Sequence, residues 1–208
     1  MEALLLIDIQ NDFLSGGSLA VSGSDEVISV ANNLQDFFEV VIATQDWHPP
    51  EHESFATNHK GKMPGDKIKL NGTHQVLWPN HCIQNSKGAE FSKSLKTDKV
   101  WKVVRKGTDP KIDSYSGFYD NEHKKMTPLN DLLTERNVDS VYIAGLAADV
   151  CVNFTVLDSL ELGYKTIVVT DGTKAVEGDD AKEKTLKALQ GKGAILKTSE
   201  EIIEEKSV

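Results

Sequence analysis

A chain of 208 residues, 39% of them hydrophobic, can bury a full core and lies within the size range of one domain. Its net charge of −9, without a Lys/Arg cluster, argues against nucleic acid or an anionic membrane surface as partner. No segment approaches the ~20 apolar residues of a spanning helix, and the N-terminal apolar run lacks the basic residues of a signal peptide. With two cysteines and no secretion signal, we expect free thiols and a cytoplasmic protein.

Strand and helix patterns alternate along the chain. Apolar runs predict strands at 3–8, 39–45, 99–105, 139–145, 164–170 and 193–197. Helical spacing of apolar residues predicts helices near 24–38, 149–162 and 178–190, with Ser24 as the N-cap of the first and Gly163 ending the second. The acidic stretch 200–205 is expected to be a solvated terminus. These alternating units favour an α/β fold with a parallel sheet covered by helices on both faces.

The pattern breaks between about residues 46 and 98. This insertion is rich in proline and glycine and holds five of the six histidines, which are His48, His52, His59, His74 and His81. A long irregular segment inside a compact domain is usually functional or disordered, and its histidines and tryptophans favour function. No repeat or linker divides the chain. We therefore expect one domain over residues 1–208 that contains this insertion.

Four reactive side chains lie just past the ends of predicted strands: Asp8, Asp46, Lys106 and Cys151. In an open parallel α/β sheet, ligands bind in the crevice outside the carboxyl ends of the strands. The four are therefore candidates for one pocket. Alone, Asp8 could equally be a cap or turn residue, and Lys106 a surface lysine. Together with Cys151 they form a set in which the carboxylate takes the thiol proton and the ammonium holds the resulting charges.

Cys151 follows the small-residue turn 145–149 and opens a predicted helix. A helix N-terminus stabilises a thiolate and lowers its pKa, and free backbone N–H groups there can hold an oxyanion. The alternative is a structural cysteine on a helix face, with Asp149 as a first-turn residue that suits the helix dipole. Cys82 could be a thiolate ligand, but a small buried hydrophobic residue is the favoured interpretation.

A carboxylate and several imidazoles predict a metal site in the insertion. Asp46 and His48, two apart in an extended segment, point to the same side, as two ligands of one ion must. His52 joins them if the prolines turn the chain, and His81 is a further candidate. Carboxylate and imidazole together suit Zn, Mn or Fe. The alternative is that these histidines are polar loop residues, but their clustering favours the metal.

Several motifs occur in a family order: DIQNDF at 8–13, DWHP at 46–49 followed by His52 and by SFA at 54–56, WPNHCIQ at 78–84, KG at 106–107, YSGF at 115–118 and GLAADVCV at 145–152. The chain resembles, over nearly its whole length, the nicotinamidases of the isochorismatase-like cysteine hydrolase superfamily. The wider superfamily shares the Asp, Lys and Cys. The Asp-x-His pair together with Trp-Pro-x-His-Cys is specific to nicotinamidases.

This resemblance implies a three-layer α-β-α fold with a six-stranded parallel sheet. The catalytic set it implies is Asp8 as base, Lys106 as charge stabiliser and Cys151 as nucleophile. The metal ligands it implies are Asp46, His48 and His81, while His52 matches a position that ligates in some members only. The ion is typically zinc, with Fe and Mn as alternatives.

The resemblance also implies how a substrate is held. The aromatic positions that flank the substrate ring are Phe13, Trp78 and Tyr115. Backbone N–H groups of Ala147 and Cys151 form the oxyanion hole, with a cis peptide in the preceding turn, expected at Ala147–Ala148. Family members usually carry a hydroxyl residue where Ala148 stands, so only a backbone role is expected at that position.

The implied activity is hydrolysis of nicotinamide to nicotinate and ammonia through a Cys thioester, in NAD salvage. One alternative is another hydrolase of the superfamily, acting on a carbamoyl compound or a related small molecule, which leaves the histidine-rich insertion unexplained. A second is a non-catalytic protein that binds metal or ligand on the same fold. The oligomeric state stays open, and a homo-oligomer is compatible with the sequence.

Overall fold

One parallel sheet organises the molecule. A computed structural model describes residues 1–70 and 72–207, and it confirms the predicted six-stranded sheet, in the order β5-β2-β1-β6-β7-β8. The strands are β1 (Glu2–Ile7), β2 (Val40–Asp46), β5 (Lys102–Lys106), β6 (Ser140–Leu146), β7 (Lys165–Lys174) and β8 (Ile195–Lys197). The helices are α1 (Asp25–Leu34), α2 (Leu129–Glu135), α3 (Cys151–Glu161), α4 (Asp179–Gly191) and α5 (Ser199–Lys206).

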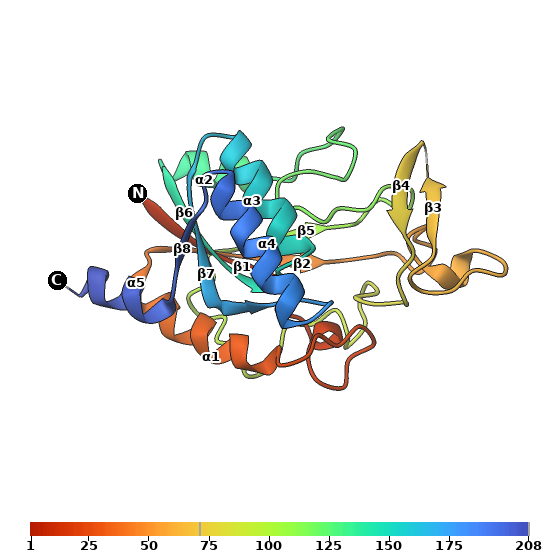
Figure 1. Cartoon of the computed structure of the whole chain (residues 1–208), viewed down its shortest axis with the longest axis horizontal. Helices are drawn as coiled ribbons and strands as arrows, with labels where there is room; N and C mark the ends of the chain where they lie inside the picture. The colour runs from red at the N-terminus through yellow and green to blue at the C-terminus, as the bar shows by residue number, and fades with distance from the viewer. Residues whose placement is uncertain (71, 208) are drawn as a thin grey trace.

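Helices cover both faces of the sheet, which gives the three layers expected (Figure 1). Alternate residues of a strand point to opposite faces, and β1 divides its leucines accordingly. Leu4 and Leu6 pack in a core shared with α1 and α5. Leu5 and Ile7 pack in a second core shared with α2, α3 and α4. A central strand with apolar residues on both faces is held firmly in place, and so is the residue that follows its carboxyl end.

Some element boundaries differ from the sequence prediction. The first helix ends at Leu34, and residues 35–37 form a 3-10 turn instead of continuing it. Ser24 precedes the helix, but its side chain makes no capping hydrogen bond because its backbone is already helical. Strand β5 begins at Lys102, three residues later than predicted. Strand β7 continues to Lys174, beyond its predicted end at residue 170. Helix α2 was not predicted, since its short apolar pattern lies beside Pro128.

The C-terminal acidic stretch is a helix, not the solvated terminus expected. Thr198 and Glu201 form a reciprocal capping box that begins α5. Ile202 is fully buried against the α1 side of the sheet. Lys206 forms an ion pair with Glu2 and lies over the Phe38 ring, 4.3 Å from its centroid. A capping box and one buried isoleucine therefore outweigh the charge of the stretch.

The insertion contains an antiparallel hairpin, β3 (Lys67–Leu70) with β4 (Thr73–Val76), and a 3-10 turn at Ala56–Asn58. In Figure 1 the hairpin stands beyond the carboxyl ends of the sheet, at the end of the molecule opposite both termini. The insertion therefore lies where a parallel sheet places its ligands. Within the part of the chain that the structure describes, no helix is long and apolar enough to cross a membrane.

Candidate active site and metal centre

Neighbouring strand ends assemble the site. Asp8 follows β1 directly, with φ +48°. Asp46 and Lys106 are the last residues of β2 and β5, and they face each other in register. Because β1 lies between β2 and β6, the turn after β6 brings Cys151 to the same edge. The structure thus gathers at one place the four side chains that the sequence predicted to share a pocket.

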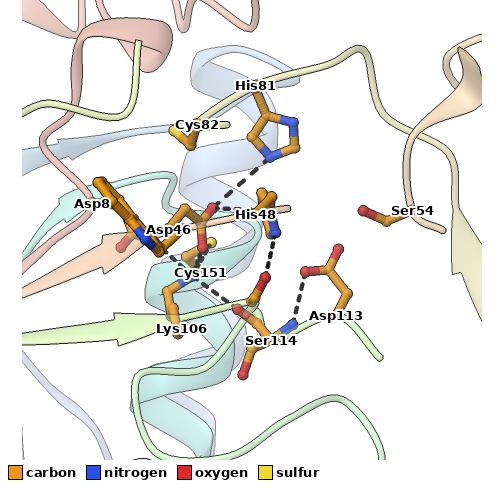
Figure 2. Close-up of polar contacts among 12 residues, drawn as sticks. Asp8, Asp46, His48, Ser54, His81, Cys82, Lys106, Asp113, Ser114 and Cys151 are labelled. Atoms are coloured by element: carbon orange, nitrogen blue, oxygen red, sulfur yellow. Dashed lines mark hydrogen bonds and ion pairs between the residues drawn. The ribbon is translucent and has the colours of Figure 1, made fainter. Parts of the chain in front are cut away.

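Lys106 is the centre of this group (Figure 2). Its buried ammonium lies 2.8 Å from Asp8 Oδ2 and donates to Asp46 Oδ1 at 2.5 Å. It also donates to the Ser114 carbonyl at 2.9 Å and contacts Cys151 Sγ at 3.4 Å. A buried ammonium with two carboxylates and a carbonyl is fully partnered. One cation therefore holds both the carboxylate expected to act as a base and the thiol.

The charges are distributed unequally between the two carboxylates. Burial raises the pKa of Asp8 to about 6, although Lys106 opposes that rise. Burial acts on Asp46 as well, but Lys106 and His48 together hold the pKa of Asp46 below its ordinary value. Burial opposes the charge of Lys106, and the two carboxylates nonetheless raise the pKa of its ammonium. Asp46 is therefore the fixed anion, while Asp8 is the carboxylate poised to exchange a proton near neutral pH.

The thiol of Cys151 differs from the sequence-based expectation. Its position as the first residue of α3 predicts a lowered pKa, but burial raises the pKa of Cys151, with Asp8 adding to the rise and Lys106 only partly offsetting it. Desolvation next to a carboxylate outweighs the helix terminus. Burial therefore favours the protonated thiol, from which a base removes the proton during the reaction.

The turn before Cys151 also differs in detail. The cis peptide is Leu146–Ala147, one residue earlier than expected. Ala148 lies beyond it and donates its N–H to the Lys174 carbonyl at 2.8 Å, which extends the pairing with β7. The Asp149 carboxylate accepts hydrogen bonds from the N–H groups of Val176 and Glu177. Asp149 thus fastens the turn to the next loop and is not simply a dipole partner.

The predicted ligand histidines have the tautomers that a metal requires. Nδ1 of His48 lies 2.9 Å from the Gly107 carbonyl, and Nδ1 of His81 lies 2.8 Å from the Pro79 carbonyl. A carbonyl only accepts, so each ring donates its Nδ1–H, and in the neutral ring the free lone pair is on Nε2. Both Nε2 atoms face Asp46 Oδ2, at 3.6 and 3.9 Å.

The donor set fits a divalent cation. Asp46, His48 and His81 are buried, and their ligand atoms all lie within 4.8 Å of one another. His48 Nε2 makes no hydrogen bond within the described residues, so a buried lone pair there lacks a partner. Burial and the neighbouring His48 lower the pKa of His81 to about 4, which keeps that ring neutral. Burial acts to lower the pKa of His48, but Asp46 raises it above its ordinary value, so an ion at this place would compete with a proton for His48. Imidazoles in their deprotonated form, together with a carboxylate, are ligands for zinc-like ions.

His52 has the opposite tautomer. Its Nδ1 accepts the Ser54 N–H at 3.1 Å and lies 2.7 Å from the Ser54 hydroxyl. A nitrogen that accepts a backbone N–H carries no proton, so the proton of a neutral ring is on Nε2. Burial lowers the pKa of His52, which favours that neutral ring. In this arrangement His52 does not present a metal-binding lone pair towards Asp46, although it forms a second buried cluster with His48 and Asp113.

The remaining histidines and the second cysteine lie outside this group. His59 contacts the Glu53 carbonyl through Nε2, and His74 is exposed on β4. Cys82 is fully buried in the core on the α1 side, in agreement with its favoured interpretation as a small hydrophobic residue.

One cavity joins the thiol to the metal ligands. It opens among the three predicted aromatic residues, Phe13, Trp78 and Tyr115. Asp46, His81, Ala147 and Cys151 also line it. Small-molecule pockets have this character, with mostly apolar walls and a few convergent polar groups. A planar ring with one polar atom and one reactive group could reach both the metal ligands and the sulfur.

Several supporting residues were not found from the sequence. Thr44 donates its hydroxyl to Asp8 Oδ1 at 2.6 Å, and Gln10 binds both the Asp46 N–H and the Asp46 carbonyl. Asp113 lines the cavity, and Gln75 on β4 donates a hydrogen bond to the hydroxyl of the wall residue Tyr115. Thr44 lies two residues before Asp46 on β2, so the alternation of the strand predicts that both side chains point to the same face. The contact between Gln75 and Tyr115 depends on how the β3–β4 hairpin folds back towards the sheet. The periodicity of the sequence does not indicate that arrangement.

Comparisons with known proteins agree with this architecture. The isochorismatase domain family matches residues 2–201. A nicotinamidase of Escherichia coli (strain K12) is 48% identical over 178 residues, which cover 84% of this chain and 83% of that protein. The solved nicotinamidase/pyrazinamidase of Acinetobacter baumanii is similar with a TM-score of 0.93 and 42% identity, covering 97% of both chains. The pyrazinamidase of Pyrococcus horikoshii, solved in complex with zinc, has a TM-score of 0.78 and 33% identity over 95% of this chain and 98% of that one.

A doubly covered parallel sheet with a cysteine, a lysine and a carboxylate at its carboxyl edge defines a cysteine hydrolase. The chain belongs to the isochorismatase family, and within that family to the nicotinamidases.

Proposed function

We propose that this protein hydrolyses nicotinamide to nicotinate and ammonia, with Cys151 as nucleophile, Asp8 as proton acceptor and Lys106 as charge stabiliser. The observation that carries the proposal is the single cavity that contains both Cys151 and the metal ligands Asp46 and His81. Nicotinamide has two polar groups, the pyridine nitrogen and a carboxamide on the ring carbon meta to it. The cavity offers each of these groups a chemically suited partner. The physiological setting we propose is salvage of the pyridine nucleotide NAD.

The first half-reaction is acyl transfer to sulfur. Asp8 takes the proton of Cys151, and the sulfur bonds to the amide carbon while the carbonyl electron pair moves onto oxygen. Lys106, in contact with both Asp8 and the sulfur, stabilises the negative charge as it moves. The oxyanion is held by N–H groups of Ala147 and Cys151, each worth about 3 kcal/mol. When the tetrahedral species collapses, the C–N bond breaks and Asp8 returns the proton to the departing ammonia.

The second half-reaction releases the acid. A water molecule attacks the thioester carbon while Asp8 accepts one of its protons. The C–S bond then breaks as Asp8 passes that proton to the sulfur, which restores the Cys151 thiol, and the acid product loses its remaining proton to solvent as nicotinate. Asp8 thus acts as base and acid in each half-reaction, which a carboxylate with a pKa of about 6 can do near neutral pH.

Asp46, His48 and His81 would hold one divalent ion, for which we propose zinc. The ion would supply Lewis-acid attraction for the ring nitrogen and so orient the substrate. The ring itself would lie among Phe13, Trp78 and Tyr115, whose apolar surfaces exclude water from the carboxamide.

The test is ammonia release from nicotinamide by the purified protein, with Cys151→Ala and a chelator-treated sample beside it. We expect release that is abolished in the variant and reduced by the chelator. Cys82→Ala is the matched control, since it removes the other buried thiol, which does not line the cavity. Full activity in Cys151→Ala would exclude the covalent route. Absence of release by the metal-loaded wild type would exclude nicotinamide as substrate, and N-carbamoyl compounds would be assayed next.

A further inference from the structure

A histidine and two acidic residues gather on the outer side of α3, away from the cavity. Asp158 and Glu161 are three residues apart on this helix, which places them on one face. His123 approaches them from the loop before α2, and its Nε2 lies 3.3 Å from Asp158 Oδ1. The ligand atoms of all three lie within 4.8 Å of one another. They line a surface hollow together with Phe154, Leu157, Leu160 and Lys192.

We propose that His123, Asp158 and Glu161 form a second divalent metal site, separate from the one at the strand ends and suited to a transition-metal ion such as Zn²⁺. An imidazole with two carboxylates is a donor set for Zn, Mn or Fe, whereas Mg²⁺ and Ca²⁺ prefer oxygen ligands alone. Three protein ligands leave the remaining coordination positions to water, and the surface hollow gives water access to them.

Asp158 supplies an observation that the cluster alone does not. Its residue exposure is only 4%, and among residues 1–70 and 72–207 its Oδ2 atom has no donor in hydrogen-bonding geometry. A buried carboxylate oxygen without a partner costs free energy that a bound cation would offset. Burial raises the pKa of Asp158, with Glu161 adding like charge, while the Ser116 hydroxyl and His123 only partly counter this. His123 pairs with Oδ1 and the Ser116 hydroxyl is near enough to lower the pKa of this carboxyl group, yet Oδ2 makes no hydrogen bond within the described residues.

Lys192 also lines the hollow and carries a charge of the wrong sign for a metal. It is a single ammonium beside two carboxylates, so the local balance remains negative. The imidazole is held in place from its other face, because the His123 ring stacks on Tyr119 with centroids 4.6 Å apart and planes 5° from parallel. A held imidazole loses less entropy when it binds an ion than a free surface histidine does.

An ion at this place would connect two parts of the active site. Helix α3 begins at Cys151. The loop that carries His123 also carries Tyr115, whose N–H donates to the Asn121 side chain at 2.9 Å. Coordination by His123 together with Asp158 would therefore fasten the loop of one cavity wall to the helix of the nucleophile. We expect the ion to stabilise this contact without taking part in the chemistry.

The experiment counts bound metal in the full-length protein, without substrate, by equilibrium dialysis and calorimetric titration with Zn²⁺. Wild type should bind two ions per chain, the His81→Ala and His123→Ala variants one each, and the double variant none. Asp158→Asn and Glu161→Gln should each weaken the second site at least about tenfold, since even indirect partners of a metal cost 10–100-fold. His74→Ala, another exposed histidine, is the matched control and should leave both ions bound.

Two results would overturn the proposal. One is wild-type stoichiometry in His123→Ala, because the ion would then lie elsewhere. The other is complete loss of binding in His81→Ala, because a single site would then account for all the metal. Glu161→Gln alters an exposed side chain and guards against a His123 variant that fails to fold. None of these readouts uses nicotinamide turnover, so the outcome is independent of the function proposed above.

Discussion

The two halves of the active site are built by different means. Asp8, Asp46 and Lys106 stand at the ends of neighbouring parallel strands, where pairing within the sheet fixes their distances. His48 and His81 belong to the insertion, and single carbonyls, of Gly107 and Pro79, orient their rings. The strand half derives its precision from the core of the domain. The insertion half derives it from a few individual hydrogen bonds.

Asp46 belongs to both halves. One carboxylate oxygen accepts from Lys106 at 2.5 Å, and the other faces the two imidazoles. The proposed ion and the proposed catalytic lysine therefore share an anion. The two halves should be separable by mutation everywhere except at this residue.

The largest effect is expected for Asp46→Asn, which disturbs both halves at once. The amide cannot neutralise Lys106 or bind the ion as a carboxylate does. We expect kcat/KM for nicotinamide to fall by about 10³-fold or more and the ion held by Asp46, His48 and His81 to be lost. Loss of one partner from a buried ion pair also costs about 3–5 kcal/mol of stability, measurable by denaturant unfolding.

His81→Ala is the comparison for that variant. It should also lose the ion from this site, but it keeps the pair between Lys106 and Asp46 and should unfold at higher denaturant concentration than Asp46→Asn. Equal losses of stability in the two variants would show that Asp46 does not connect the halves.

The pH dependence tests the strand half alone. Asp8 must be ionised to accept the Cys151 proton, and burial raises its pKa to about 6. Activity should therefore be fully present above that pKa and fall as the pH drops through it, by about tenfold per pH unit. A nearby bound cation favours the carboxylate, so the acidic limb of kcat/KM should lie at or below about pH 6. A limb well above neutrality would contradict Asp8 as the base, and Asp8→Asn, which has no titrating carboxyl, should lack the limb together with most of the activity.

Gly107→Ala is designed to break the insertion half. A Cβ at this glycine would lie 2.3 Å from His48 Cε1, and the backbone φ of +63° is already unfavourable for other residues. His48 must move, so we expect metal affinity and kcat/KM to fall by about 10–100-fold. Gly61→Ala is the control, because it has a similar φ of +76° but no atom within 4 Å of the new Cβ. Tight metal binding in Gly107→Ala would show that the carbonyl contact does not position the ring.

The same division explains what the sequence could predict. Apolar runs located the strands, and the end of each run located Asp8, Asp46 and Lys106, because a parallel sheet aligns its carboxyl ends. The helix terminus predicts a lowered pKa for Cys151, whereas burial beside Asp8 raises it, and that burial depends on packing that a helix terminus does not reveal. The cis peptide lies at Leu146–Ala147, one residue before the predicted position. Ala148 pairs with Lys174 of β7, and the sequence pattern does not show this pairing.

The smallest effect concerns Gln75, the contact between the hairpin and the cavity. Its side-chain amide donates to the Tyr115 hydroxyl at 2.8 Å, and Trp78 donates to the same oxygen at 3.0 Å. Two donors on one oxygen hold both aromatic walls in place. Gln75→Leu removes one donor, and a net hydrogen bond of about 1 kcal/mol corresponds to roughly fivefold. We expect KM for nicotinamide to rise by that factor with kcat nearly unchanged, because the wall binds the ring and does not touch the reacting atoms.

The Ile68→Val variant distinguishes the effect of losing this hydrogen bond from the effect of a less stable hairpin. Ile68 lies opposite Gln75 in the β3–β4 register, so its truncation weakens the hairpin without removing the polar contact with Tyr115. A rise in KM confined to Gln75→Leu would assign the effect to the hydrogen bond. Equal changes in both variants would mean that the hairpin acts only through its stability. Because Tyr115 belongs to the segment that follows β5 and Trp78 to the insertion, the first result would show that the insertion positions a wall of the cavity as well as the metal.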